Sequence, residues 1–362
     1  MPISAVDSIN SAFEHTKQQL FRPLKFGQWT RLAVVGLFAG ELSSGGGCNF
    51  RVPSFNPPHH RAFPAVPHWN PALLVPLIIV AAIVIPVLWF LFLYINSRMR
   101  FVLFDSVVEK KCEVGRMWDQ RSRPALQYFL WQIAFAIVSL MGFAILVGIP
   151  VLITFLLGWF RNAHAHIAGL ILGGLIVFTF FLCWMLLTLV VHLFTKDFVV
   201  PLMALEGVSA FEGWRRLLPM LNAERVRYAG YTGMKIALAL GAAIVVGIAA
   251  VIVILLLLIP IGGIAIVSIL LAKGAGLGWS AGTITLAIVA GCLLVAFLVY
   301  VVALISVPVI VFFPAYSIHF FAARYPLLAA LIYPPPPAPA APEVPPTPPP
   351  ILPPEPLPGP AV

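Results

Sequence analysis

The sequence has few charged residues. Only 10% of its 362 residues are Asp, Glu, Lys or Arg, whereas 61% are hydrophobic. Charged residues make up about a quarter of an average soluble domain, which needs them to cover its surface. The shortage of charge therefore excludes an ordinary soluble fold and predicts a polytopic membrane protein.

Cysteine is scarce as well. Four cysteines occur, none of them in a CxxC pair. This excludes a disulfide framework and the common zinc motifs, so we expect no metal and no cofactor. Two connections rich in histidine leave open a transition-metal site, although irregular proline-rich loops also scatter histidines: His59, His60, His68, His164 and His166.

Constellations of catalytic side chains are missing too. The histidines His15, His192 and His319 are isolated in the sequence, which favours packing or interfacial roles. The carboxylates of the polar connections stand beside arginines and lysines, so solvated charge or local pairing explains them: Asp105, Glu109, Glu206 and Glu212. We therefore expect no enzymatic activity.

What the sequence has instead is long apolar runs. Five of them contain no charged residue and exceed the roughly 20 residues that a helix needs to cross a bilayer core. They are predicted as helices, because they lack the alternation of a membrane barrel strand. We predict an all-α polytopic fold with spans at Leu73 to Ile95, Tyr128 to Trp159, Ile167 to Phe194, Ile236 to Ala272, and Ala281 to Phe313.

The basic residues lie between these runs. Residues 96–126 contain seven Lys or Arg and residues 196–235 contain six, whereas residues 159–166 and 273–280 contain one each. Segments rich in Lys and Arg stay in the cytoplasm. The distribution predicts both basic segments and both termini on the cytoplasmic side of a membrane, and the composition fits a bacterial inner membrane. The net charge of +9 then reflects membrane topology and not nucleic-acid binding.

A sixth crossing is predicted at residues 26–42. The segment before it is basic and the one after it is not, so the chain must change sides between them. The stretch "FGQWTRLAVVGLFAGEL" is short, and its Arg31 and Glu41 would have to reach the interfaces from the helix ends. An interfacial or half-inserted helix remains the alternative.

The letters "SAFE" occur twice, at residues 11–14 and 209–212. Each is a capping-box pattern, in which the serine hydroxyl accepts a hydrogen bond from the amide three residues on and the glutamate returns to the serine amide. The pairs are Ser11 with Glu14 and Ser209 with Glu212.

An amphipathic helix follows the second "SAFE". We expect it to lie in the cytoplasmic interface, with Trp214 at headgroup depth and Arg215 and Arg216 facing lipid phosphates. A connecting helix packed on the bundle is the alternative.

A similar plan recurs three times. An amphipathic piece leads into two apolar helices, which end in an apolar element expected to be extended: "RFVLF", "DFVVPL" and "SVPVIVF". This predicts three parallel two-helix units at residues 1–99, 100–197 and 198–313, within a membrane domain of residues 1–333. Kinks or breaks are expected at four residues inside the helices: Pro150, Pro260, Gly262 and Gly263.

Residues 334–362 form a separate proline-rich tail. Such a composition cannot build a core and favours an extended, disordered segment. The tail is either a ligand for a protein partner with an aromatic groove or a passive spacer.

Two stretches carry a family resemblance. "FVVPLMALEGV" and "SAFEGWRRLLPMLNAERVRYAGYTGMKIALAL" resemble the membrane domains that precede some bacterial glycerophosphoryl diester phosphodiesterases, and related uncharacterised multi-pass bacterial proteins. The resemblance covers about residues 1–330 and implies a multi-helix membrane fold. The chain has neither the soluble catalytic barrel nor the metal cluster of His, Glu and Asp, so the resemblance does not imply hydrolase activity.

The sequence thus favours a non-catalytic membrane scaffold that contacts anionic lipid headgroups and protein partners. A transporter or channel for a small or lipid-like solute is the alternative, since duplicated helix pairs with interrupted helices are typical of transporters. A membrane enzyme is a third reading, with no residues to support it.

Overall fold

The structure is a computed structural model, and it describes residues 4–22, 24–41, 71–160, 164–274 and 281–333. Within these ranges every regular element is helical, so the all-α class is confirmed. The elements are α1 (Asp7–Phe21), α2 (Phe26–Phe38), α3 (Pro71–Val108), α4 (Val114–Gln120), α5 (Ser122–Phe143), η2 (Ala144–Gly148), α6 (Ile149–Leu156), α7 (Ile167–Phe194), η3 (Thr195–Val199), α8 (Val200–Glu206), α9 (Ala210–Ala223), α10 (Arg225–Gly274), α11 (Ala281–Ala322) and α12 (Pro326–Ile332), where η2 and η3 are π-helical turns.

Five helical segments in the described residues are long and apolar enough to cross a membrane, so the chain is an integral membrane protein. They overlap the five predicted spans but extend beyond them at the ends that carry charged residues. The helix of α3 continues to Val108, and α10 already begins at Arg225. Basic residues that the sequence assigned to connections therefore lie on the long helices.

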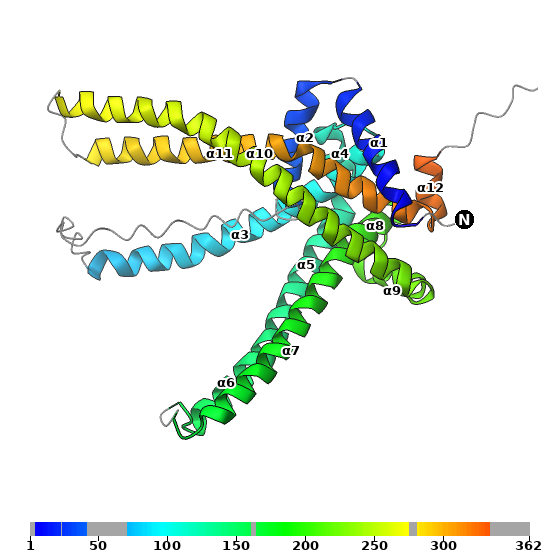
Figure 1. Cartoon of the computed structure of the whole chain (residues 1–362), viewed down its shortest axis with the longest axis horizontal. Helices are drawn as coiled ribbons and strands as arrows, with labels where there is room; N and C mark the ends of the chain where they lie inside the picture. Colours follow the sequence, from blue (N-terminus) through cyan, green and yellow to red (C-terminus); the bar gives the residue numbers. More distant parts are fainter. Residues whose placement is uncertain (1–3, 23, 42–70, 161–163, 275–280, 334–362) are drawn as a thin grey trace, which may run out of the picture.

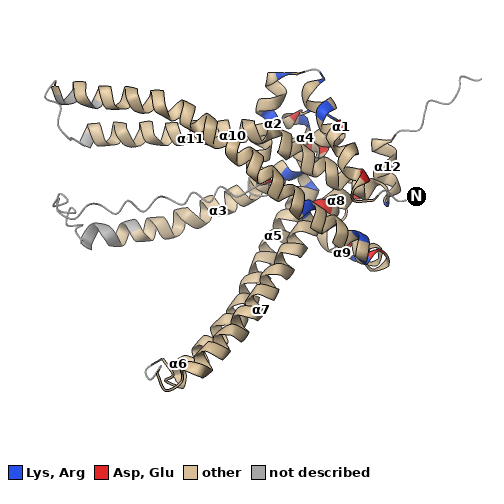
Figure 2. Ribbon diagram, in the orientation of Figure 1, with Lys and Arg blue, Asp and Glu red and all other residues tan. Residues whose placement is uncertain are grey.

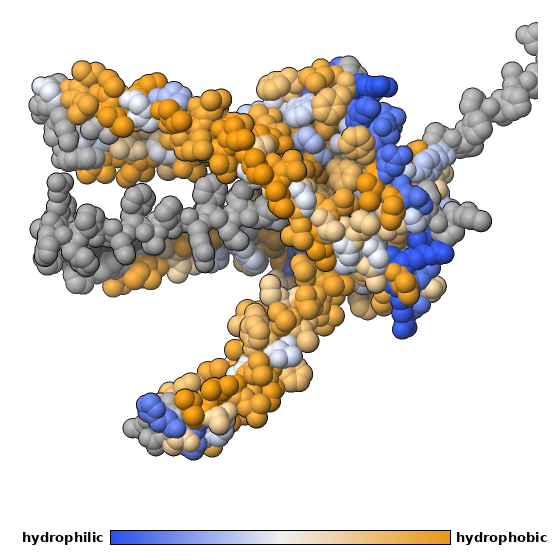
Figure 3. Space-filling model, viewed as in Figure 1, coloured by the Kyte–Doolittle hydropathy of each residue, from blue (hydrophilic) through white to orange (hydrophobic). Residues whose placement is uncertain are grey.

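The helices form a head from which long legs diverge (Figure 1). We call α1, α2, α4, α8, α9, α12 and the adjoining ends of the long helices the head. The legs are α3, the pair of α5–α6 with α7, and the pair of α10 with α11. Charged residues gather in the head (Figure 2), and the rim opposite the legs is hydrophilic (Figure 3).

The legs bury little of their apolar surface against one another. In each candidate span the most apolar stretch is at most 6% buried inside the chain. Water would disfavour so large an apolar surface, whereas the hydrocarbon of a bilayer would not. Lipid, or other membrane helices, must therefore cover the legs.

The packed core lies in the head. Phe198 of η3 contacts the rings of Tyr228 and Tyr231 of α10 and of Phe320 and Phe321 of α11, with ring centroids 5.1–6.0 Å apart. All five side chains are buried. Edge-to-face and offset aromatic contacts of this kind stabilise a core beyond the burial of their area.

Each of three short helices packs on the end of a long helix. Helix α4 contacts α3, α9 contacts η3 at the end of α7, and α1 contacts α11. The last contact brings the beginning of the described chain onto its final long helix. The head is thus closed by contacts between elements far apart in the sequence.

A sixth crossing was predicted at residues 26–42, but the described part of this range, residues 26–41, does not supply a spanning helix. The helix α2 has 13 residues, which is shorter than the roughly 20 needed, and it packs on α11 and α3 in the head. Leu32 and Val35 are fully buried there, and Glu41 is buried as well. The prediction of a crossing at these residues is wrong, because their apolar face meets protein and not lipid.

The predicted extended elements are corrected, and the helices continue through the residues predicted as kinks or breaks. The stretches "RFVLF", "DFVVPL" and "SVPVIVF" are helical. Pro260, Gly262 and Gly263 lie inside the continuous α10, and Pro150 follows η2 in a helix that continues through α6. A proline stands two residues past each π turn, Pro150 after η2 and Pro201 after η3, where the wider turn accommodates a ring without a donor.

We predict that the packing of α2 on α11 tolerates no side chain at Gly36. A Cβ atom there would lie 2.5 Å from Cγ2 of the buried Ile310. The G36A substitution should lower the free energy of unfolding by about 1–3 kcal/mol. The measurement is thermal or denaturant unfolding of the protein in detergent.

The matched control is G27A in the same helix, where a Cβ atom meets nothing within 4 Å. This change should be neutral or stabilising by up to about 1 kcal/mol. Equal effects of the two substitutions would contradict the packing of α2 in the head.

Candidate functional site: a buried ionic network in the head

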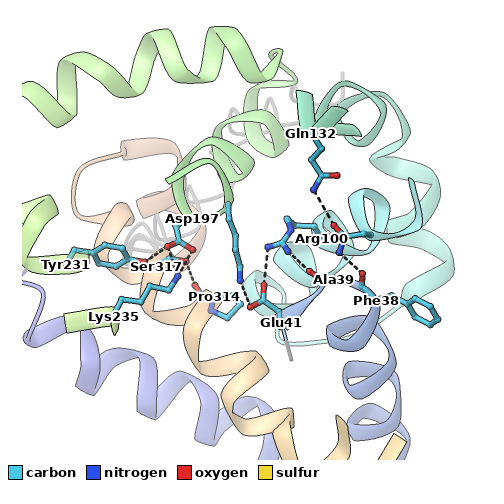
Figure 4. A network of polar contacts seen from close by, with 12 residues as sticks. Phe38, Ala39, Glu41, Arg100, Gln132, Asp197, Tyr231, Lys235, Pro314 and Ser317 are labelled. Carbon is cyan, nitrogen blue, oxygen red and sulfur yellow. Dashed lines mark hydrogen bonds and ion pairs between the residues drawn. The ribbon is translucent and has the colours of Figure 1, made fainter. Parts of the chain in front are cut away.

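Five charged side chains meet in the head (Figure 4). Glu41 follows α2 and accepts from Arg100 of α3 at 3.1 Å and from Lys196 of η3 at 2.6 Å. Asp197, the next residue of η3, accepts from Lys235 of α10 at 2.5 Å. The side chains of all five are at most 10% exposed.

The end of α2 positions Glu41. Gly40 has a φ of +74°, a left-handed conformation that favours glycine, and it turns the chain away from the helix axis. The carbonyls that end α2 are capped from α3, since Asn96 donates to Phe38 at 2.8 Å and Arg100 donates to Ala39. The same arginine thus fixes the backbone of the turn and the carboxylate that follows it.

Electrostatics favour the ionised carboxylate. Burial alone would raise the pKa of Glu41, but the charges of Lys196 and Arg100 outweigh burial and hold the pKa at about 2. The network contains three cations and two carboxylates, which leaves one positive charge in excess. Buried charges of this kind are tolerated only when they are paired and hydrogen-bonded.

Neutral groups extend the network along the helices. Tyr231 donates to Asp197 at 3.0 Å, and Ser97 donates to Gln132 of α5 at 2.8 Å. Gln132 in turn donates to Asn96 at 3.3 Å. Polar contacts therefore join α2, α3, α5, η3 and α10 in one layer of the head.

A small cavity of about 30 Å³ adjoins the network, lined among others by Glu41, Arg100, Lys196, Asp197 and Ser317. It has room for about one or two water molecules. Among the described residues, Nε of Arg100 has no hydrogen-bond partner, so a donor remains for such a guest. The cavity lies in the head and not at the level of Pro150 or Pro260.

The ion pairs of the network hold helices together. Both carboxylates are engaged by cations, and the described residues contain no group of three or more His, Cys, Asp or Glu that could hold a metal ion. The histidines His59, His60 and His68 and the proline-rich tail lie outside the described residues. His164 and His166 are part of a short turn before α7.

The second "SAFE" stretch begins α9. Ser209 is its N-cap residue, and its hydroxyl accepts from the amide of Glu212 at 3.3 Å. The glutamate does not complete a capping box, because its carboxylate contacts Arg215 and Arg216. Arg216 also pairs with Glu206.

Trp214 contacts the head, and its predicted position at headgroup depth stays a prediction. Its indole donates to the hydroxyl of Thr195 in η3 at 3.0 Å, so the side chain is directed into the head. Leu217 is fully buried, whereas Phe211 and Leu218 are exposed. The predicted apolar face is therefore divided between the head and the surroundings.

The first "SAFE" stretch is not a helix start. The helix α1 already begins at Asp7, so Ser11 and Glu14 lie in its interior. The N-cap residue is Val6, whose side chain makes no capping bond, and the amide of Asp7 donates to the hydroxyl of Ser4 at 3.2 Å. Glu14 pairs with Lys17 at the surface. The repeated letters therefore occupy different places in their helices.

Sequence reasoning missed the ionic network and a histidine pair. His15 and His319 are isolated in the sequence, but their rings are in contact in the head. Asp105, for which solvated charge or local pairing was predicted, is buried and pairs with Arg121 at 2.9 Å. The sequence held one signal that could have indicated the network. Arg100 and Asp197 directly precede the apolar stretches "FVLF" and "FVVPL", which supply part of the core.

A family model matches residues 3–331 and carries the description "family of unknown function (DUF7544)". The match covers most of the chain, which therefore belongs to this family. No curated protein and no solved structure matches the chain. The link to the membrane domains of glycerophosphoryl diester phosphodiesterases stays a prediction.

We predict that E41Q destabilises the head. It leaves Arg100 and Lys196 buried without their counter-charge, and the loss of one partner of a buried pair costs about 3–5 kcal/mol. The stability that Glu41 provides is present above its ordinary pKa of 4.5 and is lost as the pH falls from there to about 2. E41Q should remove this part of the acid sensitivity, measured by unfolding at a series of pH values.

The control is E14Q, which removes an exposed pair with Lys17. Exposed pairs contribute about 0–1 kcal/mol, so this change should be nearly neutral. Equal stabilities of E41Q and E14Q would show that the network does not hold the head together.

Proposed function

We propose that this member of a family of unknown function is a non-catalytic membrane scaffold, whose head holds pairs of spanning helices apart so that their apolar sides bind lipid or other membrane proteins. One observation carries the proposal. The legs stay almost entirely unburied by their own chain, while the packing and the ionic contacts are concentrated in the head. Such an arrangement offers several separate apolar surfaces at fixed relative positions.

We infer that the scaffold consists of three related units. Phe101 of α3 meets Tyr128 of α5 edge to face at 5.9 Å, and Phe198 of η3 meets Tyr231 of α10 at 5.1 Å. The residue four positions after each tyrosine has a polar side chain that contacts the unit before it in the chain. Gln132 contacts Ser97, and Lys235 contacts Asp197. These parallel contacts support duplication.

The head is proposed to lie on the cytoplasmic side of a bacterial inner membrane. The basic residues of the described chain gather there (Figure 2), and positive segments are poorly translocated. Both α1 and α12 belong to the head, which supports cytoplasmic termini. A proline-rich tail continuing from α12 would then be available to a cytoplasmic protein partner.

Helix α9 is proposed to touch anionic lipid. Phe211, Arg215 and Leu218 follow one another at spacings of four and three residues, so they form one stripe. The Arg215 side chain is 75% exposed and Phe211 is 73% exposed. An exposed stripe of apolar and basic residues suits the boundary between acyl chains and lipid phosphates.

Site-specific photocrosslinking in native membranes tests the scaffold. Crosslinkers that replace the exposed Leu152 of α6 or Leu187 of α7 should give adducts with lipid or with other membrane proteins. The crosslinker at Phe211 should give adducts with anionic phospholipid. Leu217, which is fully buried beside these surfaces, is the control and should give only adducts within the chain. Leg positions that crosslink only to other legs would mean a closed bundle and would overturn the proposal.

Transport of a lipid-like solute is a second candidate. The observation in its favour is that charged residues with a small cavity lie on helices that cross the membrane, where ionisable groups often mark a pathway. Transport predicts that vesicles containing the protein move a fluorescent phospholipid between leaflets faster than protein-free vesicles do. The scaffold predicts equal rates.

A further inference from the structure

Two histidines 304 residues apart in the sequence meet inside the head. The Nε2 atom of His319 in α11 lies 3.2 Å from Nδ1 of His15 in α1, and the rings are arranged edge to face. Each residue is only 5% exposed. The pair joins the first helix of the described chain to the last long one.

The neighbours of the two rings fix where their hydrogens lie. Nε2 of His15 is 2.8 Å from the carbonyl oxygen of Val107, which can only accept, so Nε2 must donate. The Nδ1 atom of a neutral His15 then accepts from Nε2 of His319. The remaining Nδ1 of His319 accepts from the hydroxyl of Tyr333, 2.7 Å away. With both rings neutral, every contact from Tyr333 to Val107 is satisfied.

An added proton changes this arrangement. On Nδ1 of His15 it would face the N–H of His319, unless His319 moves its own hydrogen to Nδ1. In either case the Tyr333 hydroxyl has to turn from donor to acceptor for Nδ1 of His319 to keep a partner. The added proton also leaves a charge on a histidine pair that is only 5% exposed, and a buried charge is costly.

The charged surroundings add to this effect. Lys110, which follows α3 and binds Gln18 of α1, acts on both rings. Tyr333, directly after α12, is the titratable group that faces the pair from that side, and Arg324, between α11 and α12, is engaged by Glu224. Burial lowers the pKa of His15, Lys110 lowers it further, and the bond to Val107 opposes both.

We propose that the chain from Val107 through His15 and His319 to Tyr333 is a proton-operated clamp, which holds α1 and the end of α12 to α3 and α11 when neutral and releases them in mild acid. The release is local, because the ionic network lies elsewhere in the head and shares no residue with the histidine pair. It would free α1 and the residues that lead into the proline-rich tail, and it would uncover the surface of α11 beneath α1. The clamp is independent of the proposed scaffold role.

Hydrogen exchange of the full chain in detergent, corrected for the intrinsic pH dependence of exchange, tests the clamp. A histidine that is neutral when clamped and has an ordinary pKa near 6.5 when released takes up a proton on opening. Opening of α1 and α12 should therefore increase by about tenfold between about pH 7.5 and about pH 5.5 if one histidine titrates, and by about a hundredfold if both do.

The H15Q variant is the sharper probe. A glutamine amide can donate to Val107 and accept from His319 but cannot titrate, so H15Q should stay clamped at about pH 7.5 and lose the share of the acid response due to His15. The double variant H15Q/H319Q should lose the response altogether. H164Q changes an exposed histidine outside the head and should keep the full response.

Two results would overturn the clamp: a wild-type protein whose α1 and α12 open equally at both pH values, or a double variant that responds as the wild type does. If the glutamine variants fail to fold, nitrogen NMR of labelled histidines in the wild type decides. It should find His15 neutral, with its hydrogen on Nε2, at about pH 7.5. A charged ring at that pH would overturn the proposal.

Discussion

The structure depends on the cost of leaving a charge or a backbone polar group unpaired in hydrocarbon. Lipid accepts the legs because their backbones are paired within helices and their side chains are apolar. The same cost keeps most of the described ionisable groups in the head and the rest at the tips of the legs. Each buried carboxylate of the head has a cation within 3.1 Å. Arg100 fulfils two of these demands, since it neutralises Glu41 and also caps the carbonyl of Ala39 that α2 leaves unsatisfied.

The head gains its cohesion from contacts between elements that are distant in the chain. Helices α1, α4 and α9 each cover the end of a long helix, and the aromatic cluster around Phe198 fills the space between η3, α10 and α11. The legs contribute little to this packing. A tightly packed head and legs that are free to contact lipid or partners are the physical basis of the proposed scaffold.

Composition was sufficient to predict the five spans, because a helix must be long and uncharged to cross a bilayer whatever its partners are. The network was beyond prediction, because Glu41 and Lys196 are 155 residues apart and nothing local indicates their pairing. The same holds for His15 and His319. The crossing predicted at residues 26–42 failed for a related reason. An apolar helix face has the same sequence pattern whether it contacts lipid or the side of α11. The start of α1 at Asp7 shows that a capping pattern at Ser11 does not by itself begin a helix.

The most direct test asks whether the head and the tips of the legs lie on opposite sides of a membrane. Single cysteines would be placed at Gln120 and Asn222 in the head and at His164 in the turn between α6 and α7, in a variant without other cysteines, and treated with a membrane-impermeant maleimide on intact cells. The proposed topology predicts immediate labelling at position 164, and labelling at 120 and 222 only after the membrane is permeabilised. Labelling of 120 and 222 from opposite sides, or of all three from one side, would contradict it.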